Sequence, residues 1–336
     1  MALLDCEGFS FSTTIADYLT YNILPVGSTS NTNIYTGGPL GDNYLDTINS
    51  SVNYKKQIAS PITTFYCGVR AQNVMSLMVD DISNTNQLSA QVSLANNTIS
   101  VYRNGTLLQS VFIGYLASSW FYLELGGVIA SGTGGSVIVR LNGATIINLT
   151  GQNTAGGGAN NISRYGVQSG AISGHFQTSH WYLCDGTGPA PWNTFLGDIR
   201  VQPMNPTSND VVQFTANGLA SQYLNAAKSP PVPASDYNSD ATVGDQDTFN
   251  CNAITGVTTQ TVLGLSVKAL AAKSDSGLKS AQTVLKSGGT TDLGTSTVLS
   301  TGGIFLTKMY PTDPNTSAAW TLANANAAKP GYKVSA

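Results

Sequence analysis

The chain has 336 residues, of which 41% are hydrophobic and only 10% are charged, against about 25% charged residues in an average globular protein. At about 150 residues per domain, this length predicts two domains. The formal net charge is −3 and the 15 Lys and Arg residues are scattered, with Lys55-Lys56 as the densest spot, which argues against nucleic-acid binding. The first residues lack a basic region and a long apolar stretch, so we expect no membrane attachment and no export signal.

The four cysteines are Cys6, Cys67, Cys184 and Cys251. They are separated by dozens of residues, with no C-x-x-C pair and no histidine at metal-ligand spacing. We therefore expect reduced, mostly buried thiols rather than disulfides or metal ligands.

Short apolar or alternating runs separated by turn residues predict an all-β chain. Between residues 60 and 205 the expected strands are, in chain order, 65–70, 76–79, 87–94, 98–103, 106–112, 120–128, 136–141, 144–149, 180–185 and 196–201. Asn104-Gly105 and Asn142-Gly143 predict tight hairpin turns, because both dipeptides favour positive φ, and the two hairpins together are expected to supply four neighbouring strands. Many short strands with little helical periodicity predict a two-sheet sandwich. Residues 1–60 are less informative and fit an opening strand, long loops and an assembly arm.

The second half of the chain begins with a proline-rich stretch. Pro206, Pro230, Pro231 and Pro233 punctuate it, so we predict a first domain over 1–205, a linker over 206–240 and a smaller β domain over 241–336. Further strands are expected at 247–251, 261–270, 281–286, 297–300 and 303–310. A short helix is expected over 320–328, before Pro330-Gly331.

The stretch from Phe65 to Val201 resembles the concanavalin A-like or laminin-G-like jelly roll. It carries a Trp-x-x-Leu-Glu-Leu strand, a Val-x-x-Asn-Gly hairpin and an aromatic strand that runs into Asp-Gly-Thr-Gly. Further motifs resemble structural proteins of tailed phages: 184–188 with 193–201, 243–249, and 313–320 with 331–334. This resemblance implies an N-terminal jelly-roll sandwich, a smaller C-terminal β-sandwich domain and a place in a virus particle.

Many jelly rolls of this kind are glycosidases, which need two nearby carboxyl groups. The chain has only two glutamates, Glu7 and Glu124, and Glu124 has no acidic residue two or four positions away. We expect Glu124 to be the partner of an arginine on a sheet face. Asp80 and Asp81 are adjacent and so point to opposite faces of a strand, which favours a solvated turn. His175 and His180 have no nucleophile motif and no paired acid at a recognisable spacing, and the Gly-rich runs at 132–135 and 156–158 are expected to be turns.

Three residues remain as candidates for ligand or subunit contact. Asp185 and Asp198 could bind Ca²⁺ together with loop carbonyl groups, against the alternative that Asp185 forms a turn and Asp198 is a buried hydrogen-bond acceptor. Trp192 lies on a predicted loop, where it could stack on a sugar ring or, as we favour, anchor a neighbouring subunit. No catalytic residue, resident metal or cofactor is expected.

These observations predict a non-enzymatic structural protein of a tailed-phage particle, made in the host cytoplasm, either a capsid decoration or a tail-associated component. Its expected partners are other virion proteins and copies of itself in a homo-oligomer. The alternative is a carbohydrate- or receptor-binding module of the tail that recognises a glycan of the host surface. A depolymerase is a third and weaker hypothesis.

Overall fold

The computed structural model divides the chain into two compact units, Met1–Val201 and Gln202–Ala336. It describes residues 3–10, 15–20, 24, 32–38, 40, 42–48, 53–73, 75–114, 119–169, 175–229, 231–255 and 261–336. Both units are built mainly from antiparallel strands, which confirms the predicted all-β class. Among these residues, no helix is long and apolar enough to cross a membrane.

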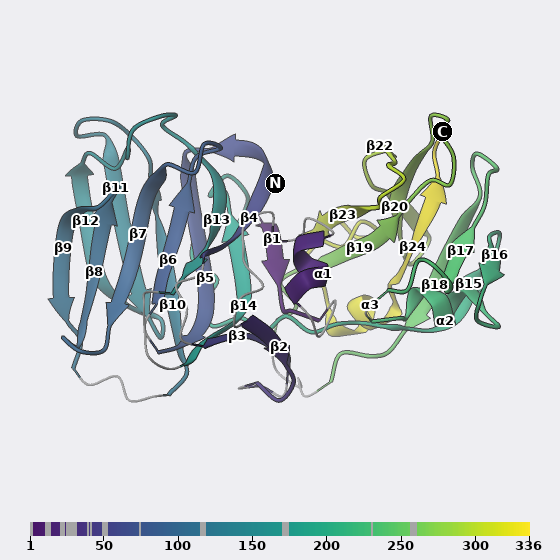
Figure 1. The fold of residues 1–336 in the computed structure, drawn as a ribbon, viewed down its shortest axis with the longest axis horizontal. Helices are drawn as coiled ribbons and strands as arrows, with labels where there is room; N and C mark the ends of the chain where they lie inside the picture. Colours follow the sequence, from purple (N-terminus) through teal and green to yellow (C-terminus); the bar gives the residue numbers. More distant parts are fainter. Residues whose placement is uncertain are drawn as a thin grey trace. The chain divides into compact units, whose positions relative to one another are not determined.

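The first unit is a jelly-roll sandwich of two sheets, which lie one in front of the other in Figure 1. The eight-stranded sheet has the order β12-β11-β10-β5-β14-β3-β2, with β1 also paired to β14, and the six-stranded sheet has the order β4-β13-β6-β7-β8-β9. The elements are β1 (Leu3–Glu7), α1 (Ile15–Thr20), β2 (Thr32–Tyr35), β3 (Tyr44–Ile48), β4 (Asn53–Ile62), β5 (Thr64–Gln72), β6 (Met75–Asp80), β7 (Asn86–Ser93), β8 (Thr98–Arg103), β9 (Thr106–Phe112), β10 (Phe121–Val128), β11 (Gly135–Leu141), β12 (Ala144–Gln152), β13 (Ile162–Gln168) and β14 (His175–Cys184).

The core of this unit lies between the two sheets. Alternate residues point inward, so β5 contributes Phe65, Cys67 and Val69 from one sheet and β6 contributes Leu77 and Val79 from the other. Each of these side chains is at most 1% exposed. The opposite, outer face of each sheet is therefore left for polar contacts and function.

Both predicted Asn-Gly hairpins are present. Asn104 and Gly105 join β8 to β9, and Asn142 and Gly143 join β11 to β12, all with positive φ. The hairpins belong to different sheets and end in the two edge strands, β9 and β12. We had expected four neighbouring strands, and this was wrong because a turn motif fixes the pairing within a hairpin but not the sheet that the hairpin joins.

The first 60 residues contribute strands to both sheets. The expected opening strand is β1, but β2, β3 and β4 are also paired into the sandwich, so the described residues do not form a separate arm. Lys56 on β4 joins the two sheets, because its ammonium group lies 2.8 Å from the carboxylate of Asp5 and 3.2 Å from that of Glu7, both on β1. These groups are largely buried, so removing one partner would leave an uncompensated charge.

The second unit is built on one six-stranded sheet with the order β15-β18-β24-β20-β21, in which β22 also pairs with β20. Two further two-stranded sheets, β16-β17 and β19-β23, complete it. Its elements are β15 (Pro206–Val211), β16 (Thr215–Asn217), α2 (Gln222–Ala226), β17 (Tyr237–Ser239), β18 (Gln246–Cys251), β19 (Leu265–Ala271), β20 (Ser280–Ser287), β21 (Thr290–Leu293), β22 (Thr297–Val298), β23 (Ile304–Tyr310), α3 (Leu322–Ala327) and β24 (Lys329–Val334).

The range 206–240 is not a linker in the structure. Strand β15 pairs with β18, and α2, β16 and β17 pack in the same unit. Pro206 lies at the first residue of an edge strand, where a missing N–H group costs no ladder hydrogen bond. The proline-rich composition therefore did not distinguish an edge strand followed by turns from an extended spacer.

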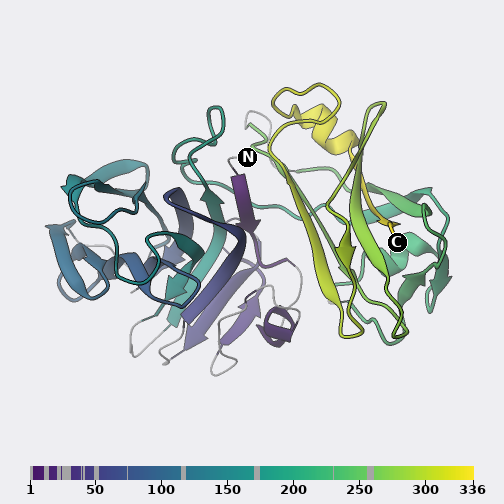
Figure 2. The same ribbon diagram turned by 90° about the horizontal axis from the view of Figure 1, so that it is seen from above.

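The predicted terminal helix is α3, and the Thr321 hydroxyl caps it by accepting a hydrogen bond from the Asn324 N–H group at 3.1 Å. In Figure 2 this helix, drawn in yellow, lies at one end of the long strands of its unit. Ala325 of α3 packs with Trp320, Tyr310 and Leu285 in the core of the second unit.

Candidate functional site

The outer face of the eight-stranded sheet brings together most of the polar and aromatic residues that could act on a ligand. Residues directly opposite in antiparallel strands share a face, so the pairings Tyr122–Arg70 and Glu124–Gly68 place these side chains on the side away from the core. One part of this face is covered by residues 192–201, which we call the strap. The other part carries exposed and half-buried aromatic rings.

The strap is held on the sheet by polar contacts to its main chain. The N–H group of Leu196 donates to the Tyr182 hydroxyl at 3.0 Å, and that of Gly197 donates to Glu124 Oε1 at 2.9 Å. The Tyr182 hydroxyl itself donates to Glu124. We had predicted a strand over 196–201, and this was wrong: the segment is irregular because its N–H groups bond to side chains instead of to a neighbouring strand.

Side chains of the strap add charged and aromatic contacts. Asp198 forms an ion pair with Arg70, and Arg200 binds both oxygens of Asp42 at 2.8 and 3.0 Å. The Phe195 ring lies edge-on to Tyr66 with centroids 4.9 Å apart. The Arg140 guanidinium lies 5.1 Å above the Phe195 ring, within range of a cation–π interaction.

Two glycines of the sheet leave room for the aromatic rings that lie beneath and within the strap. A Cβ atom at Gly68 would lie 2.4 Å from Tyr182 Cε1 and 2.8 Å from Tyr122 Cε1. A Cβ atom at Gly126 would lie 2.7 Å from the Phe195 ring. Only glycine lets the aromatic rings lie this close to the strands, so these positions fix the packing of the covered part.

Glu124 is completely buried beneath the strap. Burial raises the pKa of its carboxyl group, while the hydrogen bonds from Tyr182 and Gly197 and the positive charge of Arg140 act in the opposite direction. Arg140 lies directly opposite Glu124 in the β10–β11 pairing, but the hydrogen bonds to Glu124 come from Tyr182 and Gly197. Glu124 Oε2 has no hydrogen-bond partner among the described residues.

His180 lies at an irregularity of β14 beneath the strap. Its φ of 51° breaks the register between β14 and β5, and its Nδ1 atom accepts a hydrogen bond from Val201 at 3.2 Å. Burial lowers its pKa to about 4, although the nearby Asp42 carboxylate acts to raise it. His180 is therefore neutral at physiological pH and serves the attachment of the strap.

The uncovered part of the face carries an aromatic run beside a polar row. The rings of Tyr35 and Tyr44 stack with centroids 5.8 Å apart, and the Trp120 ring meets Tyr44 edge-on at 5.8 Å. The polar row consists of Gln72, Gln177, Asp46 and Asn33, which are in register across β5, β14, β3 and β2. Tyr35 is 40% exposed and Asn33 is also exposed. We call these seven residues the aromatic–polar face.

His175 lies beside this face. Its Nδ1 atom is 2.8 Å from Asp46 Oδ2, and its side chain is 52% exposed. Gln177 donates to the same carboxylate oxygen at 3.5 Å, whereas Asp46 Oδ1 is buried without a partner in the described part of the chain. The pKa of Tyr44 is raised, first by burial and then by the charge of Asp46.

The three site residues that we predicted are not gathered at one ligand. Asp185 forms the expected turn, accepting hydrogen bonds from the Thr187 N–H and hydroxyl groups at 2.9 Å. Asp198 is exposed and paired with Arg70, so the expectation of a buried acceptor was wrong. Trp192 is only 3% exposed, so its ring is not presented to a sugar or a subunit.

Within the described ranges, no three His, Cys, Asp or Glu side chains are grouped as a metal site would require. The carboxylate of Asp185 accepts hydrogen bonds from Thr187, and that of Asp198 is paired with the Arg70 guanidinium group. Neither arrangement resembles the set of free oxygen ligands that Ca²⁺ needs. The Ca²⁺ hypothesis gains no support from these two residues.

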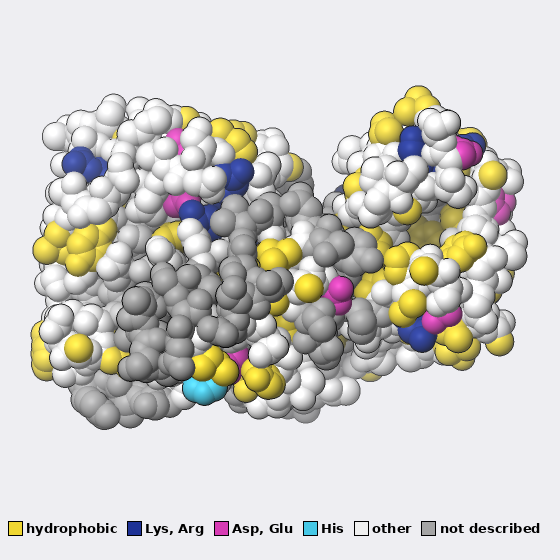
Figure 3. Space-filling view, viewed as in Figure 1, with side chains coloured by type: hydrophobic (Ala, Val, Ile, Leu, Met, Phe, Trp, Pro, Cys, Tyr) yellow, Lys and Arg dark blue, Asp and Glu magenta, His cyan; other side chains and the backbone are white. Residues whose placement is uncertain are grey.

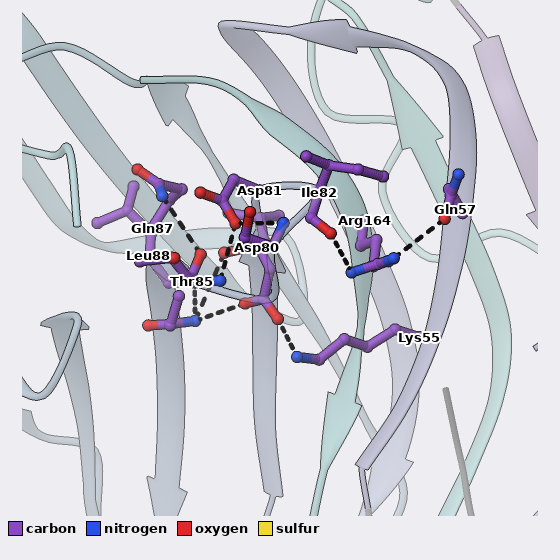
Figure 4. Close-up of polar contacts among 12 residues, drawn as sticks. Lys55, Gln57, Asp80, Asp81, Ile82, Thr85, Gln87, Leu88 and Arg164 are labelled. Carbon is purple, nitrogen blue, oxygen red and sulfur yellow. Dashed lines mark hydrogen bonds and ion pairs between the residues drawn. The ribbon is translucent and has the colours of Figure 1, made fainter. Parts of the chain in front are cut away.

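Asp80 and Asp81 are both buried, so the prediction of a solvated turn was wrong. Asp80 forms an ion pair with Lys55, and burial lowers the pKa of Lys55 to about 8 (Figure 4). Asp81 accepts N–H groups of Ser83 and Thr85, both at 2.8 Å. The two carboxylates do point to different partners, and both have structural roles.

The phage-like motifs of the second unit also have structural roles. Asp247 is buried and accepts the N–H groups of Gln213 and Phe214 at 2.8 and 3.0 Å. Asp313 is buried as well and orders the turn that follows it, accepting from the Asn315 N–H group at 2.9 Å and from Asn324 at 2.8 Å. These motifs describe how loops are held, and they do not form a ligand site.

The four cysteines are not bonded to one another, as predicted. Cys67 and Cys184 are completely buried, and burial raises the pKa of both thiols.

Charged side chains are scattered over the visible face of the molecule and form no single patch (Figure 3).

No protein-family model matches this chain, and no curated protein matches it in sequence. Solved structures with a similar fold include the alginate lyase Aly36B as a mutant with alginate tetrasaccharide, at 9% identity and a TM-score of 0.39, covering 53% of this chain and 96% of that one. The carbohydrate-binding module CBM66 from Bacillus subtilis has 9% identity and a TM-score of 0.31, covering 46% and 91%. A sialidase has 12% identity and a TM-score of 0.36, and the match covers 54% of this chain but only 18% of the sialidase. These similarities are too low to assign a function to this chain. The all-β fold class is established by the strands of the chain itself.

Proposed function

We propose that the first unit is a non-enzymatic carbohydrate-binding module that uses the aromatic–polar face. The observation that carries the proposal is the contact of Tyr35, Tyr44 and Trp120 beside a row of amide and carboxylate side chains. Aromatic rings cover the apolar faces of sugar rings, and planar amides and carboxylates bind their hydroxyl groups.

The arrangement of the acidic residues supports binding without cleavage. Glu7 binds Lys56, Glu124 lies beneath the strap, and Asp80 is paired with Lys55. Glycoside hydrolysis needs two carboxyl groups facing one glycosidic bond, one of them free to donate a proton. None of these three carboxylates is free for that purpose.

A glycan array followed by calorimetric titration of its strongest hit tests this function. We expect Trp120→Ala to weaken binding by at least about tenfold, because it removes the ring that meets Tyr44. Phe112→Ala is the matched control, since this ring is 70% exposed on β9 of the other sheet. Equal affinity for both variants, or an array without hits, would contradict the proposal.

A second candidate function is that of a structural component of a tailed-phage particle, as a capsid decoration or tail protein assembled in the host cytoplasm. The sequence motifs at 184–188 with 193–201, at 243–249, and at 313–320 with 331–334 favour it, together with the low content of charged residues. Electron cryomicroscopy of the particle tests this idea. Repeating density on the capsid would support decoration, density on the tail would support receptor binding, and absence from the particle would exclude both roles.

A further inference from the structure

We propose that the strap is a displaceable stand-in for an acidic glycan, with the Asp198 carboxylate occupying the place of a sugar carboxylate on Arg70. This inference rests on the proposed function, because it names the chemistry of the glycan and extends its site beneath the strap. Two observations support it. The strap places a carboxylate on Arg70, and it leaves buried polar atoms of the sheet without hydrogen-bond partners.

Arg70 is not fully paired by the strap. Its Nη2 atom binds Asp198, but its Nε atom is buried and has no partner among the described residues. A guanidinium group binds a carboxylate best through two parallel N–H···O bonds. Asp198 thus provides a single contact where a better-placed carboxylate would provide two.

Other polar atoms beneath the strap are also left unpaired. Glu124 Oε2 and Ser179 Oγ are buried without a hydrogen-bond partner in the described part of the chain, and His180 Nε2 has only the Asp42 carboxylate, at 3.4 Å. Ser179 lies directly opposite Arg70, and His180 follows it. Each unpaired buried group destabilises the covered state. A sugar, with several hydroxyl groups, could satisfy donors and acceptors that the strap does not reach.

The contact between the strap and Arg70 is weak. The ion pair between Asp198 and Arg70 is partly open to solvent, with 47% of the Asp198 side chain exposed. Such pairs contribute little to stability. With the strap displaced, the neighbouring Tyr66 and Tyr182 rings would join Trp120 and Tyr44 in one longer face on the same side of the sheet.

Binding of a mannuronate tetrasaccharide, compared with the neutral mannan tetrasaccharide of the same linkage, tests the ligand class. We expect the full chain to prefer the acidic sugar. Asp198→Asn should strengthen its binding by about fivefold, because the competing carboxylate is gone. Arg70→Lys should weaken it by about tenfold while leaving the neutral sugar unaffected. Equal affinity for the two sugars in all three proteins would overturn the acidic-glycan assignment.

Thiol labelling tests displacement without any glycan. Cys184 lies opposite Tyr66 on the covered face, whereas Cys67 points into the core. In a chain carrying Cys6→Ser and Cys251→Ser, we expect Cys184 to react faster than Cys67, and faster again by about fivefold with Asp198→Asn. Equal rates at both thiols would mean that the strap opens only on global unfolding, and this would overturn the proposal. Loss of neutral-sugar binding in Trp120→Ala would still support the proposed function in that case.

Discussion

The outer face of the eight-stranded sheet has a part beneath the strap and the aromatic–polar face. The two parts differ in which groups bind their polar side chains. Beneath the strap, Tyr182 and Glu124 are bound by main-chain N–H groups from the same chain, and both are completely buried. On the aromatic–polar face, Tyr35 and Asn33 remain exposed. The same sheet therefore has one part of its outer face occupied by a segment of its own chain and another part open to a ligand, so a single outer face carries two different environments.

The largest expected effect distinguishes the covered part. Gly68→Ala would place a methyl group 2.4 Å from Tyr182 Cε1, so we expect the free energy of unfolding to fall by about 3 kcal/mol. Urea denaturation followed by circular dichroism measures this change. Gly134→Ala is the control, because its Cβ atom would lie 3.3 Å from Ala130 in an exposed turn. A similar, small change in both variants would show that the cover is loosely packed.

A second, smaller effect separates the two histidines. The pKa of His180 is lowered from 6.5 to about 4 in the folded state, so the unfolded chain binds more protons between these pH values. Stability should therefore fall by about 2 kcal/mol as the pH drops from 6.5 to 4. His180→Asn, which tolerates positive φ, should remove most of this dependence, whereas His175→Asn should not. Thermal unfolding across this pH range provides the measurement, and identical pH profiles for both variants would refute the assignment.

The smallest effect on stability belongs to the aromatic–polar face. Asp46 is only 3% exposed, but Asp46→Asn keeps the shape of the side chain and its Oδ1 has no partner among the described residues, so we expect a loss of about 1 kcal/mol or less. Glycan affinity, by contrast, should fall by about fivefold, because the carboxylate is the only charge of the polar row. Paired measurements of unfolding and of binding test this division. A large loss of stability without loss of binding would assign Asp46 to the fold alone.

Local chemistry made part of the fold predictable from sequence. The Asn-Gly turns at Asn104 and Asn142 fix two hairpins, because both residues of each dipeptide accept positive φ. The apolar run in 120–128 likewise predicts a strand, which is β10. Such signals depend only on neighbouring residues, so no knowledge of the fold is needed to use them.

Contacts between distant residues were not predictable in the same way. Lys55 and Lys56 suggest a solvated surface, yet their partners Asp80 and Asp5 lie 25 and 51 residues away in sequence. The strap looks like a strand in sequence, but its N–H groups are taken by Tyr182 and Glu124. The aromatic–polar face was missed for the same reason, since Tyr44 and Trp120 meet only in the folded sheet.

Strand β14 has an implication for how the chain folds during synthesis. It pairs with β5 on one side and with β3 and β1 on the other, although β14 is made about 170 residues after β1. The middle of the sheet must therefore stay incomplete on the ribosome until residue 184 has emerged. This high contact order predicts slow folding, with the edges of β1 and β5 open to wrong partners until β14 arrives.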